Sequence, residues 1–192
     1  WRQADKYNVP RIGFVNKMDR SGADFFHVID DIKEKLGANP IPLQVPIGAE
    51  TEFKGVVDLI NNRAIVWNDE DMGMTFNEID IPEDLQSTVT EWRDKLVEAV
   101  AESDEALMEK YFEDPESITE DEMLSAIRKA TLNMSITPIL CGSAFKNKGV
   151  QTMLDAVMTF LPSPVDVESV TGINPNSENE EQRKPVVTEP FS

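Results

Sequence analysis

Two short polar stretches, far apart in the chain, carry side chains that could recognise a ligand. The first, Asn16-Lys17-Met18-Asp19, follows the apolar run at residues 12–15. An ionised carboxylate accepts two parallel N–H bonds, and guanine offers two such donors side by side, its ring N1–H and its exocyclic amine. Asp19 therefore suits the guanine edge, whereas adenine would leave this carboxylate unpaired. An ordinary polar turn after a strand is the alternative interpretation.

The residues before Asp19 have side chains that would support such binding. Lys17 can lay its aliphatic stem on the face of a purine while its ammonium group stays in water. Asn16 carries both a donor and an acceptor with which to brace the loop. In this interpretation Asp19 recognises the base edge, Lys17 covers the base face, and Asn16 braces the loop.

The second stretch, Ser143-Ala144-Phe145, follows the apolar run at residues 136–140. A turn that begins with small residues lets the backbone approach a ligand closely, and the Ala144 N–H could then donate to the guanine O6. Asp19 would read the donors of the base and Ala144 its acceptor. The alternative interpretation is a tight turn between a strand and a helix.

Both stretches resemble motifs of one protein class. Asn16-Lys17-Met18-Asp19-Arg20 resembles the guanine-specificity motif of the translational GTPases, and residues 143–151 resemble the second base-contacting loop of their elongation factor G family. The motifs lie on the order of 120 residues apart, more than a plain GTPase needs. The elongation factor G family carries a subdomain insertion at this place. Residues 161–164 and 189–192 also resemble that family, so the resemblance covers essentially the whole chain.

The resemblance implies a fold and a division into domains. The fold is α/β: the C-terminal half of a P-loop-NTPase-type parallel-sheet domain, interrupted by an α+β insertion subdomain. We expect residues 1–38 and 136–165 to form the base-recognition side of the GTP-binding domain, residues 39–135 the insertion, and residues 166–192 a linker and the entry to a second domain. The implied nucleotide contacts come from Asn16, Lys17, Met18, Asp19, Ser143, Ala144 and Phe145.

Apolar periodicity predicts the elements that would position these stretches. A helix is expected after each polar stretch, the first ending at Gly37 and the second at Pro162. Between them, residues 56–60 and 64–67 are expected to form a hairpin. The polar run at residues 172–184 is typical of a poorly ordered linker. Three further helices are expected near residues 82–100, 104–112 and 119–130, the last starting with a capping box at Thr119.

The composition bears on other classes of function. The chain has a formal net charge of −18, one cysteine and one histidine. We expect this piece to bind no nucleic acid directly and no anionic membrane, because both would be repelled. Cys141 is expected to be a reduced core thiol and His27 a solvated helix residue. A metal-dependent hydrolase is a poor alternative because no His/Cys cluster is present, and no metal site is expected.

Most of the negative charge lies in the expected insertion. Residues 80–122 contain 16 acidic and 3 basic side chains. A solvated helix face is the usual interpretation of such a run. The resemblance instead suggests a docking face for the basic C-terminal domain of the ribosomal stalk protein. The candidates for that contact are Glu91, Asp94, Glu98, Glu102 and Glu105.

The resemblance implies a parent protein that is a cytoplasmic or organellar GTPase. It would bind GTP or GDP and promote translocation of tRNA and mRNA on the ribosome. The phosphate loop G-x-x-x-x-G-K-[ST] does not occur in this sequence, which begins at Trp1. We therefore expect a fragment that binds nucleotide weakly and hydrolyses nothing, with Mg²⁺ required only in the full-length protein.

Three alternatives to a translocase stay open. Ribosome-protecting tetracycline-resistance proteins and release-factor GTPases carry similar motifs, although Met18-Asp19-Arg20 and residues 145–148 favour the translocase. The chain could also be a non-enzymatic acidic binding module in which the N-K-x-D pattern is accidental. Whether Asp19 and Ser143-Ala144 converge on one crevice about the size of a purine ring discriminates between these interpretations.

Overall fold

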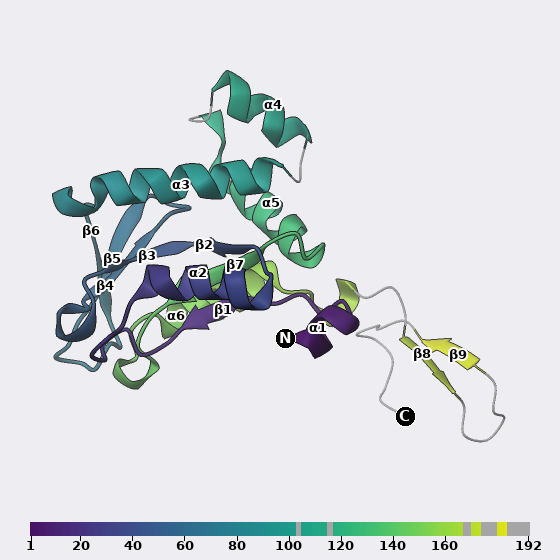
Figure 1. Ribbon diagram of the computed structural model, residues 1–192, viewed down its shortest axis with the longest axis horizontal. Coiled ribbons are helices and arrows are strands. Elements are labelled where there is room, and N and C mark those ends of the chain that lie inside the picture. Colours follow the sequence, from purple (N-terminus) through teal and green to yellow (C-terminus); the bar gives the residue numbers. More distant parts are fainter. Residues whose placement is uncertain (103–104, 115–116, 167–169, 174–179, 184–192) are drawn as a thin grey trace. The chain divides into compact units, whose positions relative to one another are not determined.

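The computed structural model describes residues 1–102, 105–114, 117–166, 170–173 and 180–183 (Figure 1). They belong to two compact units, residues 1–161 and 162–192. The α-helices of the first unit are α1 (Arg2–Lys6), α2 (Phe25–Leu36), α3 (Gln86–Ala101), α4 (Glu105–Glu113), α5 (Glu120–Leu132) and α6 (Val150–Phe160). Its strands are β1 (Gly13–Val15), β2 (Pro40–Pro42), β3 (Gln44–Ile47), β4 (Gly55–Asp58), β5 (Arg63–Trp67), β6 (Phe76–Ile79) and β7 (Thr137–Cys141).

A three-stranded parallel sheet has the order β1-β7-β2. In its central strand, Ile139 is paired with Gly13 of β1 and with Pro42 of β2. All residues of β7 are buried, as expected for a parallel strand that is covered on both faces. Ile139 and Cys141 pack in a cluster with residues of α2, whereas Leu140 packs in a second cluster with residues of α5 and α6. The predicted α/β class with a parallel sheet is confirmed.

The parallel sheet includes a strand that the sequence assigns elsewhere. The expected insertion begins at residue 39, but β2 pairs with β7 and the Leu43 N–H donates to the Ile139 carbonyl oxygen at 2.9 Å. A three-residue strand with proline at both ends shows no apolar alternation, so its sequence does not reveal it. Proline is tolerated here because β2 is an edge strand of the sheet. The chain therefore leaves the parallel sheet only after Pro42.

A four-stranded antiparallel sheet has the order β3-β4-β5-β6. Its centre is the predicted hairpin, with Val56 opposite Ile65 and Val57 opposite Ala64. Asn62 in the turn has the left-handed φ of 52° that favours asparagine. The edge strand β6 is exposed along its whole length and has no predicted counterpart, since its sequence lacks a clear apolar alternation.

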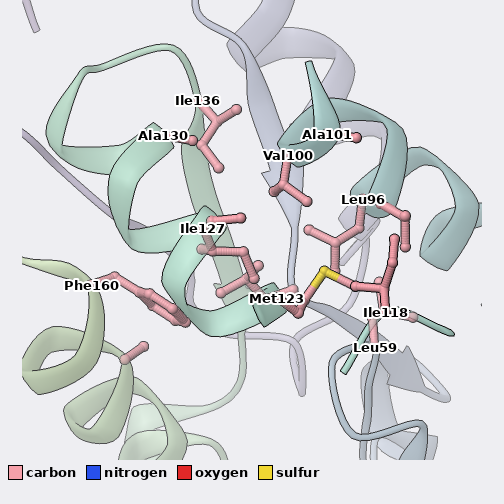
Figure 2. Close-up of a cluster of buried hydrophobic side chains, with 14 of the residues drawn as sticks. Leu59, Leu96, Val100, Ala101, Ile118, Met123, Ile127, Ala130, Ile136 and Phe160 are labelled. Carbon is pink, nitrogen blue, oxygen red and sulfur yellow. The ribbon is translucent and has the colours of Figure 1, made fainter. Parts of the chain in front are cut away.

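The predicted capping box of α5 is confirmed, since the Thr119 hydroxyl accepts from the Glu122 N–H and the Glu122 carboxylate accepts from the Thr119 N–H. Helices α2 and α3 both contact β2 (Figure 1). Figure 2 shows Met123 of α5 directed toward Leu96 of α3 and Ile118 within the larger core cluster. The described helices are all too short or too polar to cross a membrane.

The second unit contains β8 (Val170–Ile173) and β9 (Glu180–Arg183), which pair antiparallel. These strands occupy both ends of the run expected to be a poorly ordered linker. Backbone hydrogen bonds can pair polar strands without apolar alternation, so the sequence gives no sign of them. Residues 174–179 of that run, and the resembling residues 189–192, lie outside the described residues.

Candidate functional site

The two polar stretches meet at the carboxyl ends of neighbouring parallel strands. Val15 at the end of β1 is paired with Cys141 at the end of β7. Parallel strands of one sheet end at the same edge, so the loops that follow them leave the sheet side by side. The Gly142 N–H donates to the Val15 carbonyl oxygen, and the Met18 N–H donates to the Gly142 carbonyl oxygen, both at 3.0 Å. Backbone bonds therefore join the two loops directly.

Asn16 joins the loops a second time. Its Oδ1 accepts from the Lys17 N–H at 2.7 Å and from the Ala144 N–H at 3.0 Å, although Asn16 and Ala144 are 128 residues apart in sequence. The bracing role expected for Asn16 is visible in these bonds. The Ala144 N–H, expected to face a guanine O6, is already engaged with Asn16, because the amide oxygen of that side chain reaches it across the junction.

Asp19 lies beside Ser143. A hydrogen bond from the Ser143 hydroxyl holds the pKa of the Asp19 carboxyl below its usual 3.8; nearby Lys146 and Arg20 act in the same direction, and desolvation opposes them. Ser143 itself is fully buried, whereas Asp19 is only partly buried. The carboxylate is therefore still open to accept further N–H bonds.

The other predicted contact residues divide into two groups. Asn16, Lys17 and Ala144 are exposed, and the Phe145 ring is 89% exposed. The Met18 side chain is 1% exposed and packs in the cluster around α2. The Met18 side chain therefore anchors the loop in the core, and it does not face the solvent beside Asp19.

Two residues that sequence reasoning missed also fix these loops. The Glu50 N–H donates to the Met18 carbonyl oxygen at 2.8 Å, and the Glu50 carboxylate accepts from the Gly22 N–H at 2.6 Å. Lys148 is 2% exposed, and its Nζ lies 2.7 Å from Oδ1 of Asp69. Both Glu50 and Lys148 stand in polar surroundings in the sequence, and no local pattern distinguishes them from solvated charges.

Four of the five acidic docking candidates form one exposed stripe. Glu91, Asp94 and Glu98 lie on α3 and Glu102 is its C-cap, with a spacing that places them along one helix face. Glu91 forms an ion pair with Lys95 within this stripe. Glu105 begins α4, and its side chain lies outside the described part of the chain. The stripe lies on α3, whereas the two polar loops follow β1 and β7, so the stripe and the loops are separate candidate sites.

Comparisons with known proteins cover both loops and the region between them. Residues 1–163 match the family described as "Elongation factor Tu GTP binding domain". Proteins named elongation factor G are similar to the whole chain: 66% identical in Amoebophilus asiaticus, 63% in Cytophaga hutchinsonii and 54% in Karelsulcia muelleri. The chain spans 27%, 27% and 28% of the lengths of these curated relatives. A crystal structure of a Thermus thermophilus protein is 26% identical, with a TM-score of 0.75 over 86% of this chain and 24% of that one.

Proposed function

The chain belongs to the family of elongation factor Tu GTP-binding domains, and we propose that it forms the guanine-recognising part of a translation elongation GTPase. The observation that carries this proposal is the junction between the loop ending at Asp19 and the loop starting at Ser143. The acidic-module alternative required the two loops to lie apart. The similarity to proteins named elongation factor G adds support for a role in translation.

Asp19 reads the guanine edge in this proposal. Its carboxylate accepts hydrogen bonds from the ring N1–H and the exocyclic amine, and a hydrogen bond from Ser143 lowers the pKa of this carboxyl. The Ala144 N–H donates to the guanine O6 in a three-centre bond that it shares with Asn16. Adenine leaves the Asp19 carboxylate unpaired, so we expect discrimination by about four to five orders of magnitude.

The rest of the nucleotide is bound by groups outside these 192 residues. The phosphate-loop sequence, with its lysine and its metal-binding hydroxyl, is not present here. GTP and GDP are thus the nucleotides of the longer protein, and Mg²⁺ is held there. The polyphosphate supplies much of the binding through charge-assisted bonds. We therefore expect the chain alone to bind GDP weakly and to hydrolyse no GTP.

Asp19→Asn in the longer protein tests the assignment of base recognition. An amide offers one acceptor and one donor, which match the N1–H and the C2 carbonyl of xanthine. We expect GDP affinity to fall at least about 100-fold and the affinity for xanthosine diphosphate to rise, measured by fluorescence titration. Asp155→Asn, the same change at an exposed position of α6, is the control and should leave both affinities unchanged. Equal losses for both nucleotides would contradict the assignment.

We propose a second role for the acidic stripe on α3, the docking of a basic ribosomal protein. The lysine-bearing C-terminal domain of the stalk protein is the candidate partner. Glu98 and Glu102 stand at the C-terminal end of α3, where negative charge is unfavourable for the helix dipole. A basic partner would relieve both this cost and the repulsion between acidic neighbours one turn apart.

Titration with the isolated stalk domain tests the docking role. At low ionic strength we expect shifts of the NMR signals of α3. Glu98→Lys should make these shifts smaller, because it places a positive charge within the acidic stripe that the basic partner would contact. Asp155→Lys makes the same change of charge on α6 and should not weaken them. An unchanged α3 spectrum at millimolar partner concentration would contradict the proposal.

For the longer protein we propose ribosomal translocation of tRNA and mRNA in the cytoplasm. The names of the similar proteins favour this over ribosome protection or release-factor activity. A single-round translocation assay with purified ribosomes separates these activities. Stimulation of peptide release or tetracycline protection, without movement of the mRNA, would overturn the assignment.

A further inference from the structure

Lys148 is among the largest fully buried side chains of the protein, with 2% exposure. Burying an ammonium group is costly unless it is paired and hydrogen-bonded. Its Nζ lies 2.7 Å from Oδ1 of Asp69 and donates to the Phe53 carbonyl oxygen at 3.3 Å. Both partners come from the region between the two polar loops, whereas Lys148 belongs to the loop that starts at Ser143.

The backbone of Lys148 holds Ser143 directly. The Lys148 N–H donates to the Ser143 carbonyl oxygen at 3.0 Å, and the Ser143 N–H donates to the Lys148 carbonyl oxygen at 2.9 Å. A Cβ atom at Gly142 would lie 2.3 Å from that carbonyl oxygen, so the chain passes as closely as glycine permits. The Met18 N–H donates to the Gly142 carbonyl oxygen, and the Asn16 side chain accepts from the Ala144 N–H, so the position of the Lys148 loop is passed on to the residues directly before Asp19.

A second set of bonds ties the same loop to the segment around Gly73. The Gly73 carbonyl oxygen accepts from Asn147 Nδ2 at 3.2 Å and from Gln151 Nε2 at 3.0 Å. The Gln151 side chain also accepts from Trp67 Nε1 at 3.1 Å. A Cβ atom at Gly73 would lie 2.5 Å from the Lys146 carbonyl oxygen, which shows how tightly the two segments pack.

We propose that Lys148 is a positioning residue through which the inserted region sets the guanine specificity of Asp19. This inference rests on the proposed function of the two loops. Lys148 does not contact the base; it anchors the loop of Ser143 to Phe53 and Asp69, and that loop is in turn bonded to Asn16 and Met18 beside Asp19. The insertion is then part of the specificity apparatus, in addition to any docking role.

The chemistry of the base provides a selective readout. Hypoxanthine lacks the exocyclic amine of guanine, so Asp19 can accept only one N–H from it. Two parallel bonds need a correctly angled carboxylate, whereas a single bond tolerates a looser one. Releasing the loop should therefore lower the affinity for GDP more than the affinity for inosine diphosphate, so the preference for GDP should fall.

Lys148→Met in the longer protein tests the inference, because methionine keeps most of the buried side chain and removes the charge. We expect the preference for GDP over inosine diphosphate to fall about tenfold, because one of the two hydrogen bonds that Asp19 accepts from guanine is weakened. Amide hydrogen exchange at residues 143–148 should become faster. Asp69→Asn should change both readouts in the same direction by less, and it carries the test if Lys148→Met fails to fold. Glu70→Gln, the same loss of charge at the adjacent exposed residue, is the matched control and should change neither.

Each other result has a defined meaning. An unchanged preference for GDP over inosine diphosphate in Lys148→Met and Asp69→Asn would overturn the inference. An equal loss of affinity for both nucleotides, together with a lower melting temperature, would also overturn it, since Lys148 would then act only on folding. If the unaltered protein does not prefer GDP to ADP, the proposed function itself fails, and this outcome is separable because it needs no variant.

Discussion

At the scale of single residues, Asp19 shows how the pKa of a carboxyl group is lowered without the group being enclosed. The Ser143 hydroxyl supplies the largest part of the effect on the pKa of Asp19, and the cations Lys146 and Arg20 add to it. Ser143, the donor, is fully buried, whereas Asp19, the acceptor, is only partly buried, so one side of the carboxylate faces the protein and the other faces solvent. A carboxylate held in this way offers its remaining lone pairs to a ligand.

Ser143→Ala should raise the pKa of Asp19 toward its ordinary value of 3.8, because the largest of its stabilising bonds is lost. A lowered pKa in the folded state contributes stability that is present above the unfolded value and is lost as the pH falls through the folded value. The variant should lose that contribution at neutral pH. Carboxyl titration of Asp19 by NMR measures the shift, with Ser117→Ala, whose hydroxyl donates to the Asp114 carbonyl oxygen, as the control. An unshifted Asp19 would contradict the assigned bond.

At the scale of elements, the start of α5 combines a capping box with a cation from another helix. Glu122 accepts from Lys110 of α4 as well as from the N–H and hydroxyl of Thr119. The bond to Lys110 lowers the pKa of Glu122 most, followed by the two bonds to Thr119, and the value falls from 4.5 to about 2. One carboxylate thus closes the helix end and joins two helices.

The contribution of Glu122 to stability should depend on pH. Its folded pKa lies below the unfolded value, so the contribution is present above about pH 4.5 and is lost as the pH falls toward 2. We expect Glu122→Gln to be less stable than the unaltered protein at pH 7 and to approach it near pH 2. Urea unfolding at both pH values measures this. A difference that stays constant between the two would contradict the prediction.

At the scale of the whole first unit, strands β4, β5 and β7 are packed on both of their faces. Val56, Ile65 and Ile139 belong to the cluster with α2, whereas Val57, Ala64 and Leu140 belong to the cluster with α3, α5 and α6. The ring of Phe26 on α2 stacks on Trp92 of α3 with centroids 5.3 Å apart. Helices α3 and α5 and the parallel sheet therefore share one continuous core.

Met123→Ala should destabilise the protein by about 2–5 kcal/mol, because it removes a side chain from this core and leaves a cavity. Met123 lies among Leu59, Leu96 and Ile118 (Figure 2). Met158→Ala is the matched control: Met158 is 82% exposed on α6, so the change should stay within about 0.5 kcal/mol. Denaturant unfolding of the two variants compares them. Equal losses would show that α5 does not pack as described.

Local chemistry explains what could be predicted about the elements. The hairpin β4–β5, the capping box at Thr119 and the end of α2 at Gly37 follow from short-range rules of turns and helix ends. Strand β2, by contrast, is three residues long and rich in proline, and it exists because β7 lies beside it. Short strands depend on their neighbours more than on their own residues.

The order of the amino acids already defines the chemical groups of this protein: a carboxylate suited to a guanine edge, a small-residue turn, and an acidic helix face. Those properties belong to residue types and to spacings of a few positions. The contact between Asn16 and Ala144, and the pairing of the buried Lys148 with Asp69, exist only in the folded chain. The physical reason is that sheet pairing and the pairing of a buried charge join positions that no local pattern connects.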